Sequence, residues 1–231
     1  MGYRTLSFDL VLRALFLDDR AFDQLRDDDN PFVEGLFLII IIALLTALLA
    51  LIGEALAWAG SPDMADIKQI ILEVLRQSPL WPMIAPNPQA LQGFLQGWDQ
   101  GWQVLPSLFG APNPAGAAGN LLAWPIFGVI AWLVYGAVAH LFARLLHGTG
   151  TFAQTLGVTA LAFTPWLFRG LELIPYLILG GFVSTWQLLL RYKAIRSVHQ
   201  LSWGRAVWAT VLPLLLLAAL AVLIAVIVAG R

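Results

Sequence analysis

Long uninterrupted apolar runs constrain this chain more than any other feature of its sequence. A helix that crosses a bilayer of roughly 30 Å needs about 17 to 25 consecutive apolar residues. Five segments meet this requirement, and we expect each to span a membrane: 32–58, 121–146, 152–168, 173–190 and 206–230. Hydrophobic residues make up 59% of the chain and charged residues only 12%, which excludes an ordinary soluble domain.

The predicted fold is all-α, an integral membrane bundle of five transmembrane helices with amphipathic interfacial helices beside it. We divide the chain into a cytoplasmic amphipathic segment (1–30), a first transmembrane helix (31–60), an extracytoplasmic loop with two amphipathic helices (61–119) and four further transmembrane helices (120–231). The first thirty residues hold seven aspartates and no apolar signal core, so we expect no cleavable signal peptide.

The placement of positive charge predicts the orientation. With five spans, nine lysines and arginines fall on the side of the N-terminus and four on the other side. Because positive loops stay in the cytoplasm, we expect a multi-pass protein of the cell membrane with its N-terminus cytoplasmic and its C-terminus extracytoplasmic. Apolar residues of the N-terminal segment alternate with charges and predict short helices along the inner leaflet: Leu6, Leu10, Leu15, Phe16, Phe22 and Leu25.

The loop between the first two spans contains two helix starts, at Ser61-Pro62-Asp63 and at Asn87-Pro88. The second predicted helix carries Trp98 and Trp102 on an apolar face. This face is interpreted either as a surface that contacts a partner or lipid, or as a lid on the membrane surface. Tryptophan rings favour the membrane interface in both cases.

Ionisable residues of the spans are few. Glu54 lies near the outer end of the first span, and His140 lies near the inner end of the second. Neither is at the centre, where an ionisable group is a functional candidate by default. Glu54 is interpreted as a hydrogen-bonded interfacial carboxylate or a partner contact, and Arg205, just before the last span, is a further contact candidate.

Catalytic and cofactor-binding motifs are not found in the sequence. The chain contains no cysteine, and it shows no His-Glu-x-x-His motif, no P-loop and no rhomboid-like serine setting. We therefore expect no enzyme activity, no catalytic residue, no metal and no cofactor. The net charge of −1 offers no basic field for nucleic acid.

Small residues and prolines of the later spans predict how the helices pack. Gly180 and Gly181 recur with Ser184 and Thr185 at four-residue spacing, which favours close helix approach. Pro165 and Pro213 lie within predicted spans and are interpreted as packing kinks, with a gating hinge as the alternative.

Two stretches, "HGTGTFAQTLGVTALAFTPWLF" and "LLLRYKAIRSVHQLSWGRAVWATVLPLLL", resemble the Yip1 family, in which a glycine turn leads into a Gln- and Pro-containing span and a basic turn precedes the last helix. The matching residues are Gly148, Phe152, Gln154, Ala162, Pro165, His199, Ser202, Arg205, Ala206 and Pro213. The resemblance implies five spans, a cytosolic N-terminus and a minimal C-terminal tail.

Eukaryotic proteins of this family act in vesicle trafficking as partners of lipidated Rab GTPases. This sequence lacks their long cytosolic N-terminal region and acidic motif, which disfavours a GTPase partner. The expected function is that of a non-catalytic scaffold or accessory subunit that organises or stabilises other membrane proteins or lipids. Expected partners are membrane lipids, other membrane proteins or a second copy of the chain. A small-solute or ion permease and a trafficking-type adaptor are the alternatives.

Overall fold

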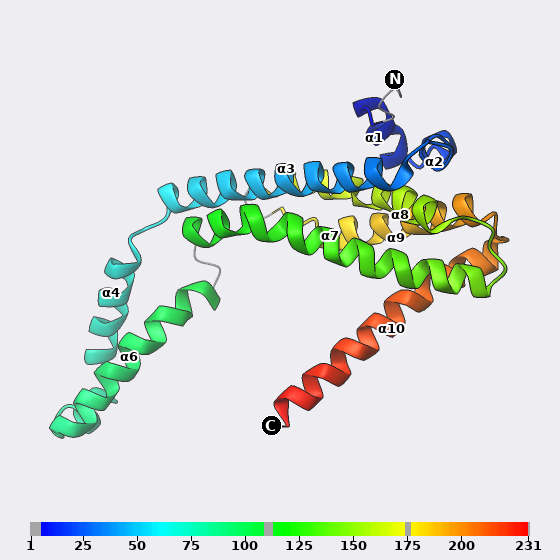
Figure 1. Cartoon of the computed structure of the whole chain (residues 1–231). Coiled ribbons are helices and arrows are strands. Elements are labelled where there is room, and N and C mark those ends of the chain that lie inside the picture. The colour runs from blue at the N-terminus through cyan, green and yellow to red at the C-terminus, as the bar shows by residue number, and fades with distance from the viewer. Residues whose placement is uncertain (1–5, 109–112, 174–176, 231) are drawn as a thin grey trace. The chain divides into compact units, whose positions relative to one another are not determined.

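A computed structural model describes residues 6–108, 113–173 and 177–230 (Figure 1). Helices are the regular elements of these residues: α1 (Phe8–Leu15), α2 (Asp19–Arg26), α3 (Pro31–Gly60), α4 (Met64–Arg76), α5 (Trp81–Ile84), α6 (Pro88–Leu108), α7 (Pro114–Leu145), α8 (Phe152–Ala160), the 3₁₀ helix η1 (Leu161–Leu173), α9 (Gly180–His199) and α10 (Trp203–Ala229). The chain divides into two compact units, Met1–Ala50 with Gly119–Arg231 (unit 1) and Leu51–Ala118 (unit 2).

Three of the described helices are long and apolar enough to cross a membrane, namely Pro31–Gly60, Ala115–Leu145 and Trp203–Ala229. They correspond to the first, second and fifth predicted spans. The predicted membrane character and all-helical class are therefore confirmed, whereas the predicted count of five spans is not.

The predicted third and fourth spans differ from the structure for separate reasons. In the third, α8 ends after nine residues and the chain continues as η1, which contains Pro165. Proline has no backbone N–H to donate and clashes with the preceding helical turn, so the α-helix does not continue through it. In the fourth, α9 begins at Gly180 and extends to His199. Its last turns carry Arg191, Lys193 and Arg196, so only its first half is apolar.

In unit 1, α3 and α8 approach each other at two glycines. A Cβ built on Gly35 would lie 2.8 Å from the Cα of Gly157, and one built on Gly157 would overlap the backbone of Pro31. The Trp132 indole of α7 donates to the Leu156 carbonyl of α8 at 2.9 Å and stacks on Phe32 of α3 at 5.6 Å between ring centroids. These contacts place α3, α7 and α8 against one another.

The N-terminal helices α1 and α2 pack into unit 1. Their inward apolar residues are fully or nearly fully buried: Leu10, Ala14, Leu15, Ala21, Phe22 and Leu25. They contact η1, α8 and α9. Leu10, Leu15, Phe22 and Leu25 of the predicted apolar pattern thus form part of the protein core, and the expected position of these helices along the inner leaflet stays a prediction.

Unit 2 contains the predicted amphipathic helices of the loop, capped as expected. Asp63 accepts a hydrogen bond from the Ala65 N–H at 2.8 Å, and the Asn87 side chain accepts from the N–H groups of Gln89 and Ala90. Lys68 of α4 donates to Asp99 of α6 at 2.6 Å, so these two helices form a hairpin within the unit.

Substitution at the α3–α8 crossing tests its packing. Gly157→Ala should lower the free energy of unfolding by about 1 to 3 kcal/mol, because overpacking forces the two backbones apart. Gly204→Ala is the matched control: a Cβ at Gly204 meets nothing within 4 Å, and alanine favours a helix. Thermal unfolding in detergent measures both variants, and equal melting temperatures would contradict the close approach.

Candidate functional site

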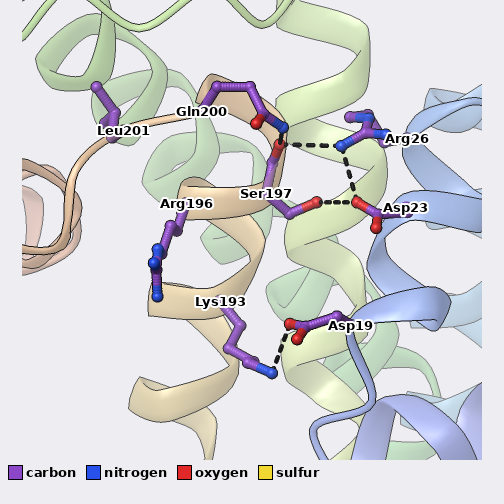
Figure 2. A pocket seen from close by; sticks show the side chains of 8 residues that line it. All are labelled: Asp19, Asp23, Arg26, Lys193, Arg196, Ser197, Gln200 and Leu201. Atoms are coloured by element: carbon purple, nitrogen blue, oxygen red, sulfur yellow. Dashed lines mark hydrogen bonds and ion pairs between the residues drawn. The ribbon is translucent and has the colours of Figure 1, made fainter.

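A polar pocket of about 570 Å³ lies between α2 and the last two turns of α9 in unit 1 (Figure 2). It is lined by Asp19, Asp23, Arg26, Lys193, Arg196, Ser197, Gln200 and Leu201. The residues of α2 are spaced so that Asp19 and Asp23 lie one helical turn apart, on the same face as Arg26. The α9 residues follow the same spacing at Lys193 and Ser197.

Individual residues define where α2 begins and where α9 ends beside the pocket. The Asp18 side chain caps α2 by accepting from the Arg20 N–H at 3.0 Å. Helix α9 ends at His199, and the next residue, Gln200, has a left-handed φ of 53°. Arg196 and His199 lie in its last turn, where cations interact favourably with the negative end of the helix dipole.

Hydrogen bonds and ion pairs join the two walls of the pocket. Lys193 Nζ lies 2.6 Å from Asp19 Oδ1, and Ser197 Oγ donates to Asp23 Oδ1 at 2.8 Å. Arg26 Nη1 pairs with the same Asp23 oxygen at 2.8 Å and donates to the Ser197 carbonyl at 3.2 Å. We name these five residues, Asp19, Asp23, Arg26, Lys193 and Ser197, the α2–α9 clamp.

The charged side chains of the clamp also bond to other groups of the same chain. Lys193 also donates to the Leu17 carbonyl at 2.6 Å. Arg26 pairs with Asp27 as well, at 2.8 Å, and this hydrogen bond raises the pKa of Arg26 and lowers that of Asp27. Arg196, by contrast, is exposed, and its guanidinium donates to the Tyr192 hydroxyl at 3.3 Å. The geometry therefore holds the two segments together.

Gln154, the polar residue of the family-like motif, connects the clamp to α8. Thr151 and Gln154 form a capping box at the start of α8, in which each side chain bonds to the other's backbone N–H. The Gln154 amide nitrogen also donates to the Arg26 carbonyl at 3.1 Å. One side chain therefore starts α8 and fixes the end of α2.

A cluster of two histidines and a threonine lies beside this connection, in which Thr155 and His199 are buried and His140 is half-buried. The Thr155 hydroxyl is 2.9 Å from His140 Nδ1 and 2.9 Å from His199 Nε2, and it donates to the Thr151 carbonyl at 2.8 Å. A hydroxyl has a single hydrogen, so both ring nitrogens act as donors to its oxygen. The other ring nitrogen of His199, Nδ1, is shielded and has no partner among the described residues.

Gly148 and Gly150 allow the chain to pass this cluster closely. A Cβ on Gly148 would lie 2.6 Å from His199 Nδ1, and one on Gly150 would lie 2.7 Å from the Val198 carbonyl oxygen. The predicted structural role of Gly148 is thus explained by close approach to the end of α9. In contrast, a Cβ on Gly180 or Gly181 meets nothing within 4 Å of the described residues, so the close approach predicted there is not found in the single chain.

The remaining predicted residues are distributed over the chain. Glu54 accepts from the Asn113 N–H at 2.8 Å. Trp98 and Trp102, with centroids 5.3 Å apart, belong to an aromatic row of unit 2 that continues through Phe94 to Trp81. Trp98 and Trp102 are half-buried, and the indole nitrogen of Trp98 is shielded from solvent.

Arg205 is exposed in the first turn of α10, whereas Pro165 and Pro213 are buried. Gly148 thus lies against the end of α9 and Gln154 bonds to the end of α2, whereas Glu54, Trp98 and Trp102 belong to unit 2. The clamp itself was missed by sequence reasoning. Its only sequence signal is the four-residue spacing of Asp19 with Asp23 and of Lys193 with Ser197, and nothing in either pair points to the other.

Groups of three or more histidine, cysteine, aspartate or glutamate residues suited to a metal ion are not found among the described residues.

Acidification should destabilise the folded protein through His199. Burial, followed by the neighbouring His140 and Arg144, lowers the pKa of His199 from 6.5 to about 4. The unfolded chain therefore binds a proton that the folded chain excludes, and stability present at neutral pH is lost as the pH falls through this window. In detergent, the melting temperature should fall less between about pH 7 and about pH 5 for His199→Gln than for the unaltered protein.

The exposed histidine His147 provides the control for this measurement. His147→Gln should retain the pH dependence of the unaltered protein. Parallel pH profiles for the His199 and His147 variants would show that the buried imidazole is not the responsible group.

Comparison with protein families supports the resemblance seen in the sequence. The Yip1 domain model matches residues 12–225, which include the end of α1, the clamp, the histidine cluster and nearly all of α10. Neither a curated protein nor a solved structure matches the chain. Since the family match spans almost the whole sequence and the described helices have the apolar character of membrane spans, the chain belongs to the Yip1 domain family of integral membrane proteins.

Proposed function

We propose that this Yip1-domain protein is a non-catalytic scaffold or accessory subunit that organises or stabilises other membrane proteins or lipids. The observation that supports this proposal is the hydrogen bonding of the hydroxyl groups in the apolar helices. Each of the following side chains donates to a backbone carbonyl three or four residues earlier: Thr46, Thr155, Thr159, Thr164, Ser184, Thr185 and Thr210.

Hydroxyl groups bonded in this way are poorly suited to conduct a solute. A permeation route must replace the lost hydration of its solute with polar groups. Here the hydroxyl hydrogens are already donated within their own helices. Trp132, the largest fully buried side chain, likewise donates its N–H to a backbone carbonyl. This arrangement favours a packing role over a small-solute or ion permease.

Gln187 differs from these residues because its side-chain N–H groups are not bonded within the described chain. A permeation route would have to use this residue. Its amide nitrogen is shielded and has no hydrogen-bond partner among the described residues. A buried, unpaired polar group is costly, and a partner subunit that supplied an acceptor would remove this cost. Gln187 is therefore compatible with a protein that completes its packing in a complex.

We further propose that the protein lies in the cell membrane with its N-terminus cytoplasmic and that it crosses the membrane five times. Helix α8 and η1 together rise about 40 Å, which is sufficient for a crossing although the element changes from α to 3₁₀. If α8, η1 and α9 instead dip into the membrane and return, the chain has three spans and the same orientation.

Cysteine labelling distinguishes these topologies, because the natural chain contains no cysteine. In intact cells, a membrane-impermeant thiol reagent should react with Gln89→Cys in unit 2 and not with Arg196→Cys at the end of α9. The end of η1 decides the number of spans. Leu171 is 49% exposed, and Leu171→Cys should react if the chain has five spans. Protection of Leu171→Cys beside a reactive Gln89→Cys would establish three spans.

Association with a membrane partner tests the scaffold proposal directly. Trp98→Ala combined with Trp102→Ala should weaken association with a co-purifying membrane protein or second copy in native lipid, since aromatic anchors contribute about 2 kcal/mol or more at an interface hot spot. Trp208→Ala is the matched control, because Trp208 is 56% exposed on α10. The ratio of partner to chain, measured by native mass spectrometry, should fall for the pair and not for the control.

The opposite results would favour the permease. They are a monomer in native lipid and a solute flux in proteoliposomes that Glu54→Gln, His140→Gln or Gln187→Leu abolishes. For the scaffold, these three variants should insert normally and leave solute flux at the level of empty vesicles.

A further inference from the structure

Helix α1 presents an apolar stripe on the face that points away from the protein core. Phe8 is 75% exposed, Leu12 is 38% exposed and Phe16, directly after the helix, is 73% exposed. Their spacing of four residues places all three on one side of the helix. The opposite side, with Leu10 and Ala14, is fully buried. Two exposed phenylalanines on a nine-residue segment need an apolar environment that the described chain does not supply.

Two hydrogen bonds show which part of α9 lies beside the end of α1. The Trp186 indole donates to the Leu15 carbonyl at the end of α1 at 2.7 Å, and Lys193 donates to the Leu17 carbonyl just beyond it at 2.6 Å. Trp186 belongs to the apolar first half of α9, whereas Lys193 belongs to its charged second half. Helix α1 therefore ends at the boundary where α9 changes from apolar to charged.

Helix α2 lies on the charged side of this boundary. Its residues Asp19 and Asp23 bond to Lys193 and Ser197, about two and three turns beyond Trp186 and further toward the end of α9. Helix α1 instead contacts the apolar helix η1. The two N-terminal helices, each of eight residues, thus lie beside different parts of α9.

The charged residues of α1 are arranged as in an interfacial helix. Asp9 and Arg13 pair at 2.7 Å, and Arg13 also donates to Gln24 of α2 at 2.7 Å. Their polar edge is thereby joined to the helix on the charged side. Helices that lie in the membrane interface bury their apolar face among the upper acyl chains while their polar edge stays with the headgroups and water.

We propose that α1 lies in the lipid interface at the charged end of α9, with Phe8, Leu12 and Phe16 inserted among the acyl chains, while α2 remains in water. The occupant of the stripe is lipid. This assignment follows from the boundary position of α1 along α9 and from its contact with η1, and it holds whether or not the protein is a scaffold.

Spin-label accessibility in vesicles tests this placement. Single cysteines replace Phe8, Phe16 or Arg20 in the full chain, which is reconstituted in vesicles of phosphatidylcholine and phosphatidylglycerol in equal parts. Phe16 and Phe8 are exposed, so their replacement leaves the core intact, and Arg20 is an exposed residue of α2 that serves as the matched control.

Labels at positions 8 and 16 should collide more often with oxygen, which concentrates in lipid, than with a water-soluble nickel chelate. The label at position 20 should show the reverse order. Nickel accessibility at 8 and 16 equal to that at 20 would place α1 in water and overturn the proposal. Low accessibility to both reagents at 8 and 16 would also overturn it, because the stripe would then be covered by protein, from this chain or from a second copy.

Discussion

The carbonyl groups at the end of α9 must find hydrogen-bond partners outside the helix, and much of unit 1 is arranged around this requirement. The last carbonyls of a helix have no partner within the helix. The Ser197 carbonyl accepts from Arg26 and from Gln200, and the His199 carbonyl accepts from the Thr149 N–H. Two segments that are distant in the sequence, at Arg26 and Thr149, thus converge with Gln200 on one helix end.

The same helix end explains why the turn before α8 contains glycines. Thr149 can reach the His199 carbonyl only if the flanking residues pass close to α9, and side chains at Gly148 or Gly150 would occupy that space. Gln154 extends the connection by bonding to the Arg26 carbonyl. The family-like motif is therefore a set of contacts that fixes helix ends, and its polar residues are used by the backbone.

The sequence predicts the apolar helices well because a long run of apolar residues has few alternatives in a membrane. Helices α3, α7 and α10 lie close to the predicted ranges. The 3₁₀ geometry of η1 could not be predicted, because a proline within a membrane helix produces only a kink in many other cases. The extension of α9 to His199 depends on Asp19 and Asp23, whose partners Lys193 and Ser197 lie far away in the sequence. Periodicity carries no information about such pairs. The apolar pattern of the N-terminal segment was also ambiguous, since burial in protein and contact with lipid require the same residues.

The distance in sequence between α1 and its binding site on α9 has a consequence for biosynthesis. Leu15 and Trp186 are separated by 171 residues, so the ribosome releases the N-terminal helices long before α9 exists. During this interval the faces that carry Leu10 and Phe22 have no protein partner. Domains generally fold as units in the order of synthesis, but here the first helices to emerge complete their packing among the last. Premature termination before α9 would therefore leave an inserted first span whose two N-terminal helices expose their apolar faces. We expect membrane quality control to recognise such a truncated chain.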